Sequence, residues 1–185
     1  MNTVLITGAS AGFGLETAKL FLSKGWRVVA GMRSPRKDLL AASDRLEILR
    51  LDVTDPDSIK AAVEEAGRID VLVNNAGIGW LNAVEGTPLD MARHIFETNT
   101  LGTIATMQAV LPAMRERRSG VIVNVSSSTT LAPMALLSVY AASKAAVNML
   151  TQSAALELAE FGIRARVVLP GAAPTTSFGN SARAL

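Results

Sequence analysis

The sequence predicts an α/β fold, a parallel sheet of six strands in three layers with helices on both faces. Short apolar runs alternate with segments of helical periodicity along the chain. The runs are continuous rather than alternating, which is typical of strands buried on both faces. Small, amide or charged residues follow most runs. Polar groups should therefore gather at the carboxyl ends of the strands, where such sheets bind ligands.

Composition narrows the class of protein. The 185 residues suit a single domain over residues 1–185, and the 49% hydrophobic content favours a globular protein. A net charge of +2 is too small to indicate nucleic acid or an anionic membrane as a partner. The absence of cysteine excludes disulfides, thiolate metal sites and cysteine nucleophiles, and we expect no metal site. We find no signal peptide or membrane span, so we expect a cytoplasmic protein.

The first expected strand, residues 4–6, leads into a glycine-rich turn and a helix that ends near Gly25. The turn reads Thr-Gly-Ala-Ser-Ala-Gly-Phe-Gly over residues 7–14. Glycines let backbone N–H groups approach a phosphate without interference from a Cβ atom, and the helix dipole favours the negative charge. The turn therefore indicates nucleotide binding, although an ordinary strand–helix turn is the competing interpretation.

Arg33 follows the second expected strand, residues 27–32. In a dinucleotide-binding unit this strand end faces the adenosine ribose, where an acidic residue binds the 2′-hydroxyl and an arginine accommodates a 2′-phosphate. No acidic residue occurs before Asp38, so the sequence favours NADP(H), with NAD(H) possible. For Arg36 and Lys37, a solvated basic loop is a serious alternative.

Four more strands complete the pattern, at residues 46–51, 69–73, 120–125 and 163–169, with helices at 56–66, 87–117 and 138–159. Asp52 either contacts an adenine or caps the helix that follows, and Asp55 before Pro56 is also a good cap. We expect the helix over 87–117 to bend near Pro112. Asn99 lies inside it, and is either exposed or makes a specific buried hydrogen bond.

Tyr140, the only tyrosine, lies one helical turn before Lys144. Positions i and i+4 share a helix face, so the phenol and the ammonium can point into the same space. A nearby ammonium lowers the pKa of a phenol, which makes a proton donor and acceptor near neutral pH. A packed tyrosine beside a solvated lysine would show the same spacing.

In order along the chain, these motifs resemble those of the short-chain dehydrogenase/reductase family. The resemblance rests on the Thr-Gly-x-x-x-Gly-x-Gly turn, Asp52-Val53, Asn-Asn-Ala-Gly at 74–77, Asn99, Asn-Val-Ser-Ser at 124–127, Tyr140-x-x-x-Lys144 and Pro170-Gly171 with Thr175. It covers nearly the whole chain and implies a Rossmann-type doubly wound sheet. It also implies hydride transfer between NADP(H) and a small carbonyl or secondary alcohol substrate.

The resemblance further implies a role for each site residue. Ser127, 13 residues before Tyr140, would hold the substrate oxygen, and Tyr140 would exchange a proton with it. Lys144 would lower the pKa of the tyrosine and bind the nicotinamide ribose, and Asn99 would anchor a water that connects Lys144 to solvent. The expected cofactor-binding residues are Gly8, Ser10, Gly12, Phe13, Gly14, Arg33, Asp52, Val53, Asn75, Ala76, Gly77, Tyr140, Lys144, Pro170, Gly171 and Thr175.

The sequence departs from the family after the Pro-Gly stretch. A substrate-covering segment and a seventh strand normally follow there, whereas this sequence stops at Leu185, so we expect both to be absent. The sequence is then a fragment, an incomplete record or a short member.

Several alternatives stay open. The main alternative to an enzyme is a regulator that binds NADP(H) without turnover, whereas the glycine spacing and short chain disfavour an epimerase or dehydratase. The long helices imply, by resemblance, a homodimer or homotetramer. Trp80, Leu131, Met134 and Leu137 indicate a hydrophobic ligand, or else belong to the core or an interface.

Overall fold

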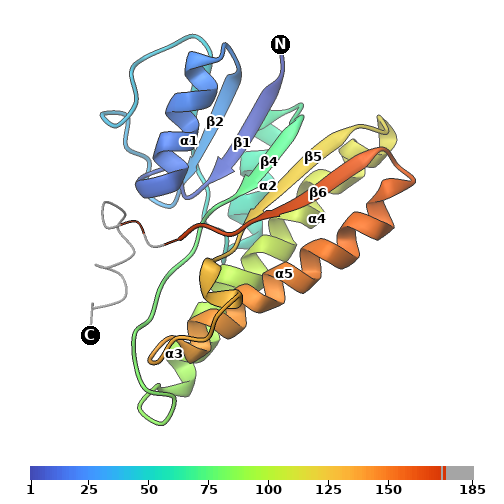
Figure 1. Ribbon diagram of the computed structural model, residues 1–185. Helices are drawn as coiled ribbons and strands as arrows, with labels where there is room; N and C mark the ends of the chain where they lie inside the picture. Colours follow the sequence, from blue (N-terminus) through green and yellow to red (C-terminus); the bar gives the residue numbers. More distant parts are fainter. Residues whose placement is uncertain (172, 174–185) are drawn as a thin grey trace.

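The computed structural model describes residues 1–171 and 173, which fold around a parallel six-stranded sheet (Figure 1). The strand order is β3-β2-β1-β4-β5-β6, and every neighbouring pair is parallel, which confirms the predicted fold class. The strands are β1 (Thr3–Thr7), β2 (Arg27–Met32), β3 (Leu46–Arg50), β4 (Val71–Asn74), β5 (Gly120–Val125) and β6 (Ile163–Val168).

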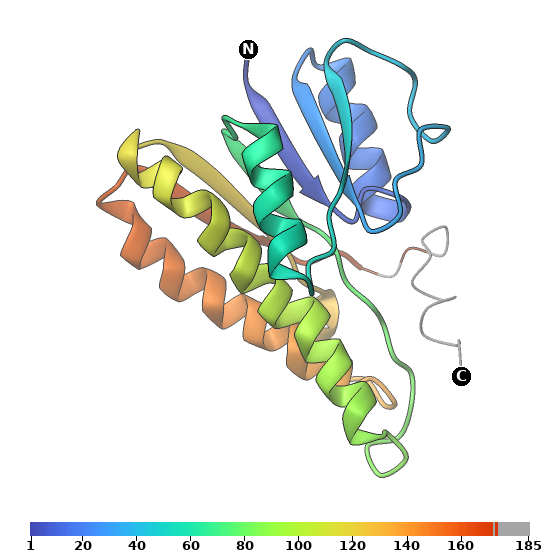
Figure 2. The same ribbon diagram turned by 180° about the vertical axis from the view of Figure 1, so that it is seen from behind.

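Helices cover both faces of the sheet. In Figure 2, α2 (Pro56–Ala66), α4 (Gly102–Glu116) and α5 (Ser138–Ala159) lie in front of the strands, and α1 (Gly12–Ser23) lies behind them. Successive residues of β1 enter different apolar clusters, since Val4 and Ile6 pack on one side and Leu5 on the other. This explains why the strand sequences are apolar at consecutive positions.

The helix expected over residues 87–117 is divided into three parts. α3 (Leu89–Phe96) is followed by the π-helical segment η1 (Glu97–Leu101), and α4 then continues through Pro112 to Glu116. The irregularity is therefore at η1, where Thr98, Asn99 and Thr100 are buried, rather than at the proline. A π-helical turn re-aims side chains within a helix and is frequent at functional sites.

β6 forms one edge of the sheet within the described residues. Ile163 and Ala165 are buried, whereas Arg164 and Arg166 are exposed on the opposite face. None of the helices in the described part of the chain is long and apolar enough to cross a bilayer.

Candidate active site

The glycine-rich turn joins β1 to α1 and depends on its glycines. Gly8 and Gly12 have φ of 67° and 52°, in the left-handed region that favours glycine. A Cβ atom on Gly14 would lie 2.4 Å from the carbonyl oxygen of Gly8. The N-cap of α1 is Ala11, and no side chain caps the helix there. The first backbone N–H groups of α1 therefore suit an anion such as a phosphate.

Asn75, directly after the neighbouring strand β4, and Thr7, the last residue of β1, brace this turn. The Asn75 side chain donates hydrogen bonds of 3.1 Å to the carbonyls of Thr7 and Gly8. In return, the Thr7 hydroxyl accepts from the backbone N–H groups of Asn75 and Ala76, each at 3.0 Å. The Asn-Asn-Ala-Gly stretch thus ties two adjacent loops together. The sequence did not distinguish Thr7 from the rest of the turn.

Arg33 is exposed directly after β2, and its charge helps to lower the pKa of Asp52. Burial raises the pKa of Asp52, but hydrogen bonds from Thr54 and the charges of Arg33 and Arg50 outweigh burial and bring the pKa below its usual value. Asp52 does not cap α2, because Asp55 occupies the cap position and accepts from two backbone N–H groups of that helix. The Asp52 carboxylate instead accepts from the backbone N–H and the hydroxyl of Thr54, and its contact with an adenine stays a prediction.

Arg36 differs from Arg33. It forms an ion pair with Asp38 at 2.5 Å, whereas no ion pair joins Arg33 to the described residues. Arg36 is thus already paired, whereas the described residues supply no ion pair for Arg33 or Lys37, so the charges of these two residues can meet a ligand.

Tyr140 and Lys144 lie on the buried face of α5, 7% and 5% exposed. Tyr140 shares a side-chain hydrogen bond with Ser127, which follows β5. Lys144 Nζ donates to the carbonyl of Val125 at 2.9 Å, so β5 and its C-terminal end contact both side chains. The predicted shared helix face is confirmed.

The predicted fall in the pKa of Tyr140 is wrong for this structure. Burial of the phenol raises the pKa of Tyr140, and the hydrogen bond with Ser127 opposes this rise only in part. Burial also lowers the pKa of Lys144 to about 8. The spacing of the two residues indicated their proximity but not the loss of hydration.

The three consecutive serines have different surroundings. Ser126 donates its hydroxyl to the carbonyl of Lys144 at 2.9 Å and so ties β5 to α5. Ser127 bonds to Tyr140, and also accepts from the backbone N–H and the hydroxyl of Thr129. Ser128 begins a short 3₁₀ turn, η2 (Ser128–Thr130), and its backbone N–H donates to the carbonyl of Pro170 at 2.9 Å. The geometry therefore places Ser127 beside Tyr140, as the spacing predicts.

Asn99 is fully buried in η1, which confirms the expectation of a specific buried hydrogen bond rather than an exposed side chain. It accepts from the N–H of Ile78 at 2.8 Å and donates to the carbonyl of Ile78 and the hydroxyl of Ser143, each at 3.0 Å. A Cβ atom on Gly77 would lie 3.1 Å from Asn99 Oδ1 and 3.2 Å from Lys144 Nζ. Asn99, Gly77 and Lys144 thus meet at one point.

A buried polar network beneath the site was not predicted. Asn74 donates to Asn124 at 2.9 Å and accepts from the hydroxyl of Thr106, and Asn124 donates to Thr151 at 2.9 Å. The network links the ends of β4 and β5 to α4 and α5. An amide at the end of each of two apolar strands is the signal that could have revealed it.

Most expected cofactor residues surround the same end of the sheet. Gly8, Ser10, Gly12, Phe13, Gly14, Asn75, Ala76 and Gly77 follow β1 and β4, Arg33, Asp52 and Val53 follow β2 and β3, and Pro170 and Gly171 follow β6. Thr175 lies outside the described residues.

A family model described as short chain dehydrogenase matches residues 2–184. The chain belongs to the short-chain dehydrogenase family. Among curated relatives, the uncharacterized oxidoreductase YusZ of Bacillus subtilis is 39% identical over 96% of this chain and 67% of its own length. Retinol dehydrogenase 8 of Homo sapiens is 39% identical over 92% of this chain. The chain spans 58% of that human protein, so it corresponds to part of the relative's length.

Solved short-chain dehydrogenase structures share the fold. A short-chain dehydrogenase from Streptomyces avermitilis has a TM-score of 0.89 at 40% identity, covering 98% of this chain and 71% of its own. ElxO with NADP bound has a TM-score of 0.86 at 35% identity over 92% and 73%. The 3-ketoacyl-(acyl-carrier-protein) reductase from Brucella melitensis, complexed with NADH, reaches 0.92 at 30% identity over 99% and 80%. Of these neighbours, ElxO holds NADP and the Brucella melitensis reductase holds NADH.

Proposed function

We propose that this protein is an oxidoreductase that transfers a hydride between NADP(H) and a carbonyl or secondary alcohol, with Tyr140 as the general acid and base. The hydrogen-bonded pair of Ser127 and Tyr140 carries the proposal, because it joins a proton donor to a second polar group at the end of the sheet that also holds the glycine-rich turn. Relatives called dehydrogenases and reductases, and neighbours with bound NADP or NADH, support it.

The residues present fit a nicotinamide dinucleotide. The turn over residues 7–14 and the uncapped start of α1 would hold the pyrophosphate, and Arg33 would meet a 2′-phosphate. Asp52 and Val53 would lie at the adenine, and Asn75 to Gly77 and Pro170 to Gly171 at the nicotinamide end. When bound, the cofactor supplies or accepts the hydride.

The reacting oxygen of the substrate would accept hydrogen bonds from Ser127 and Tyr140. Because burial raises the pKa of Tyr140, its phenol is protonated at neutral pH and suits the donor in carbonyl reduction. Ser127 and Tyr140 are held by β5 and α5, so both donors are fixed before charge develops on the oxygen. In the reverse direction Tyr140 would first release its own proton, and the phenolate would then accept the proton of the alcohol.

Lys144 and Asn99 would act beside this pair. Lys144, with a pKa of about 8, is mostly protonated at pH 7 and would bind the nicotinamide ribose. The amide of Asn99 bonds to Ile78 and Ser143, so we assign it a positioning role that sets the loop carrying Gly77 against Lys144. A water held at Asn99 would connect Lys144 to solvent and relay a proton.

The test follows the absorbance of reduced cofactor while purified protein is given NADPH or NADH and a panel of ketones, aldehydes and quinones. Oxidation of NADPH by one substrate class supports the proposal. Cofactor binding without oxidation across the panel would instead favour a regulator that senses NADP(H).

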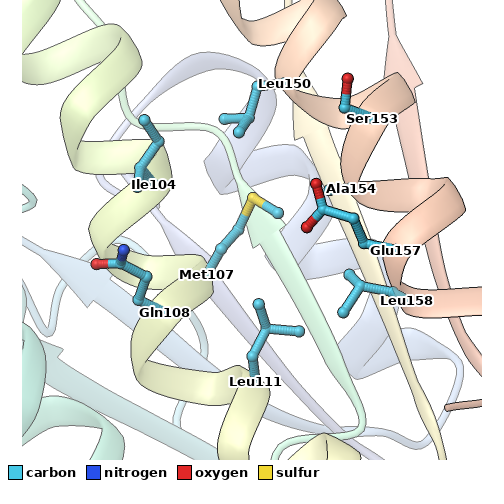
Figure 3. A pocket seen from close by; sticks show the side chains of 9 residues that line it. All are labelled: Ile104, Met107, Gln108, Leu111, Leu150, Ser153, Ala154, Glu157 and Leu158. Carbon is cyan, nitrogen blue, oxygen red and sulfur yellow. The ribbon is translucent and has the colours of Figure 1, made fainter.

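The groove between α4 and α5 is a candidate contact surface between copies of the chain (Figure 3). It encloses about 200 Å³ and is lined by both helices, with Met107 at its centre. Its other lining residues are Ile104, Gln108, Leu111, Leu150, Ser153, Ala154, Glu157 and Leu158. We propose that this helix pair forms the face of a homodimer or homotetramer, which light scattering on the purified protein would test.

A further inference from the structure

The loop between β5 and α5 carries no charge, and the loop after β4 carries only Glu85 before α3 begins. No charged residue occurs between Asp70 and Glu85, or between Arg118 and Lys144. These two stretches supply the loop after β4 and the loop between β5 and α5. Lys144, which ends the second stretch, is buried and bonded to Val125. An anionic group placed between these loops would lose hydration and meet no counter-ion from either of them.

The structure divides the apolar residues of these loops into two groups. Trp80 and Leu137 are only 8% and 6% exposed, and so belong to the core. Leu131 and Met134 are 72% and 58% exposed, between Ser127 and Tyr140 in sequence. Large apolar side chains grouped on the surface next to a site mark a place where an apolar ligand binds.

Both loops contribute to this exposed group. Leu81 and Val84, on the loop after β4, are 47% and 71% exposed. The N–H of Asn82 donates to the carbonyl of Leu136 at 2.8 Å, which holds the two loops side by side. Leu136 has φ of 65°, an uncommon state for a bulky residue, and is half exposed. We call Leu81, Val84, Leu131, Met134 and Leu136 the apolar rim.

The rim is joined to the proposed reacting groups by short turns. Leu131 follows η2, and its N–H donates to the carbonyl of Ser128, the residue after Ser127. On the other side, the N–H of Leu137 donates to the carbonyl of Met134, and Tyr140 follows in the first turn of α5. Leu131, Met134 and Leu136 therefore belong to the segment that joins Ser127 to Tyr140 along the chain, and the bond from Asn82 brings the loop of Leu81 and Val84 beside that segment.

We propose that the apolar rim selects substrates whose carbonyl or alcohol carbon bears an uncharged hydrocarbon chain, and rejects anionic ones. This rests on the proposed function, since the rim would act on the part of the substrate that extends from the oxygen held by Ser127 and Tyr140. Each CH₂ group that leaves water against the rim should raise kcat/KM by about two- to fourfold until the rim is covered.

The experiment compares methyl alkyl ketones of increasing chain length with keto acids of matched length, using NADPH. We expect kcat/KM to rise with chain length for the ketones, and each keto acid to be at least about 100-fold poorer than its matched ketone. Equal rates for ketones and keto acids of one length would overturn the inference and leave the proposed function intact.

A binding measurement separates the two proposals. The Tyr140→Phe variant is saturated with NADPH, and binding of the same compounds is followed by cofactor fluorescence. Chain-length-dependent binding of ketones but not keto acids, without turnover by the unmodified protein, would support the rim and contradict the proposed function. No preference in either assay would overturn the rim.

Substitutions in the apolar rim test whether the rim causes the dependence on chain length. Leu131→Gln and Met134→Gln should each lower kcat/KM for the longest ketone by about 5- to 10-fold and change the shortest ketone by less than about twofold. Leu20→Gln, at a 57% exposed site on α1, is the matched control and should change neither. Unchanged selectivity in the rim variants with an altered molar mass in solution would assign the rim to contact between chains and overturn the proposal.

Discussion

Asn99 and Ile78 are joined by two hydrogen bonds, one in each direction. Asn99 accepts from the N–H of Ile78 and donates to its carbonyl, which leaves one amide hydrogen for Ser143. Asn99 thereby connects η1 to the loop after β4 and to α5. Because an alanine leaves these groups unpaired, Asn99→Ala should lower the free energy of unfolding by about 2–3 kcal/mol.

Denaturation with urea measures this loss, and steady-state kinetics should show a fall in kcat larger than the change in KM. Asn82→Ala is the control, because the Asn82 amide also bonds to nearby backbone, but on a partly exposed loop. Equal losses of stability in both variants would contradict the special role of Asn99.

Tyr140→Phe removes the hydroxyl that bonds to Ser127 and keeps the buried ring. We expect kcat for carbonyl reduction to fall by about 10²- to 10⁴-fold, because general acid catalysis contributes in this range. Cofactor affinity, measured by fluorescence titration with NADPH, should change little. Retained turnover would show that another group donates the proton.

Gly14→Ala should abolish dinucleotide binding, because its Cβ would lie 2.4 Å from the carbonyl oxygen of Gly8 and equally close to the Asn75 amide. Gly25→Ala is the contrast. Gly25 has open space but φ of 80°, so the substitution should cost about 1–2 kcal/mol of stability and spare NADPH binding. Calorimetric titration with NADPH distinguishes the two effects.

Arg33→Ala should raise the KM for NADPH by about 10- to 100-fold, the value of a charge-assisted hydrogen bond, and leave the KM for NADH nearly unchanged. Arg36→Ala is the matched control in the same loop, since Arg36 is already paired with Asp38. A larger effect at position 36, or a parallel loss with both cofactors, would refute the assignment of Arg33 to the 2′-phosphate.

Lys144 should make stability depend on pH. Its pKa falls from 10.5 to about 8 on folding, so the unfolded chain binds more protons between these values and stability rises with pH across this window. Lys144→Met removes the effect. The stability of the unmodified protein relative to this variant should therefore increase between pH 7 and 10, by up to about 3 kcal/mol.

Urea denaturation at several pH values measures the difference. Measurements stop at pH 10, because burial raises the pKa of Tyr140 in the folded protein. Above pH 10 the unfolded chain loses the Tyr140 proton more readily than the folded chain, and this lowers stability. A flat difference for Lys144→Met would mean that the ammonium is hydrated.

The sequence predicted most of the sheet because burial on both faces demands consecutive apolar residues. The strands at 27–32 and 120–125 and the helices at 56–66 and 138–159 have the predicted bounds. It could not predict that Asn74 bonds to Asn124, because that contact depends on the register of β4 against β5. Nor did the spacing of Tyr140 and Lys144 reveal how deeply the fold buries both groups.

The brace between Thr7 and Asn75 has a consequence for folding. All the glycines of the glycine-rich turn lie in the first 14 residues, yet Asn75, whose side chain holds the turn, is 68 residues away from Thr7. β1 therefore gains its brace only when it pairs with β4, a contact that closes a long loop. Local opening of β4 would release the turn, so bound dinucleotide should slow hydrogen exchange at backbone amides of β4.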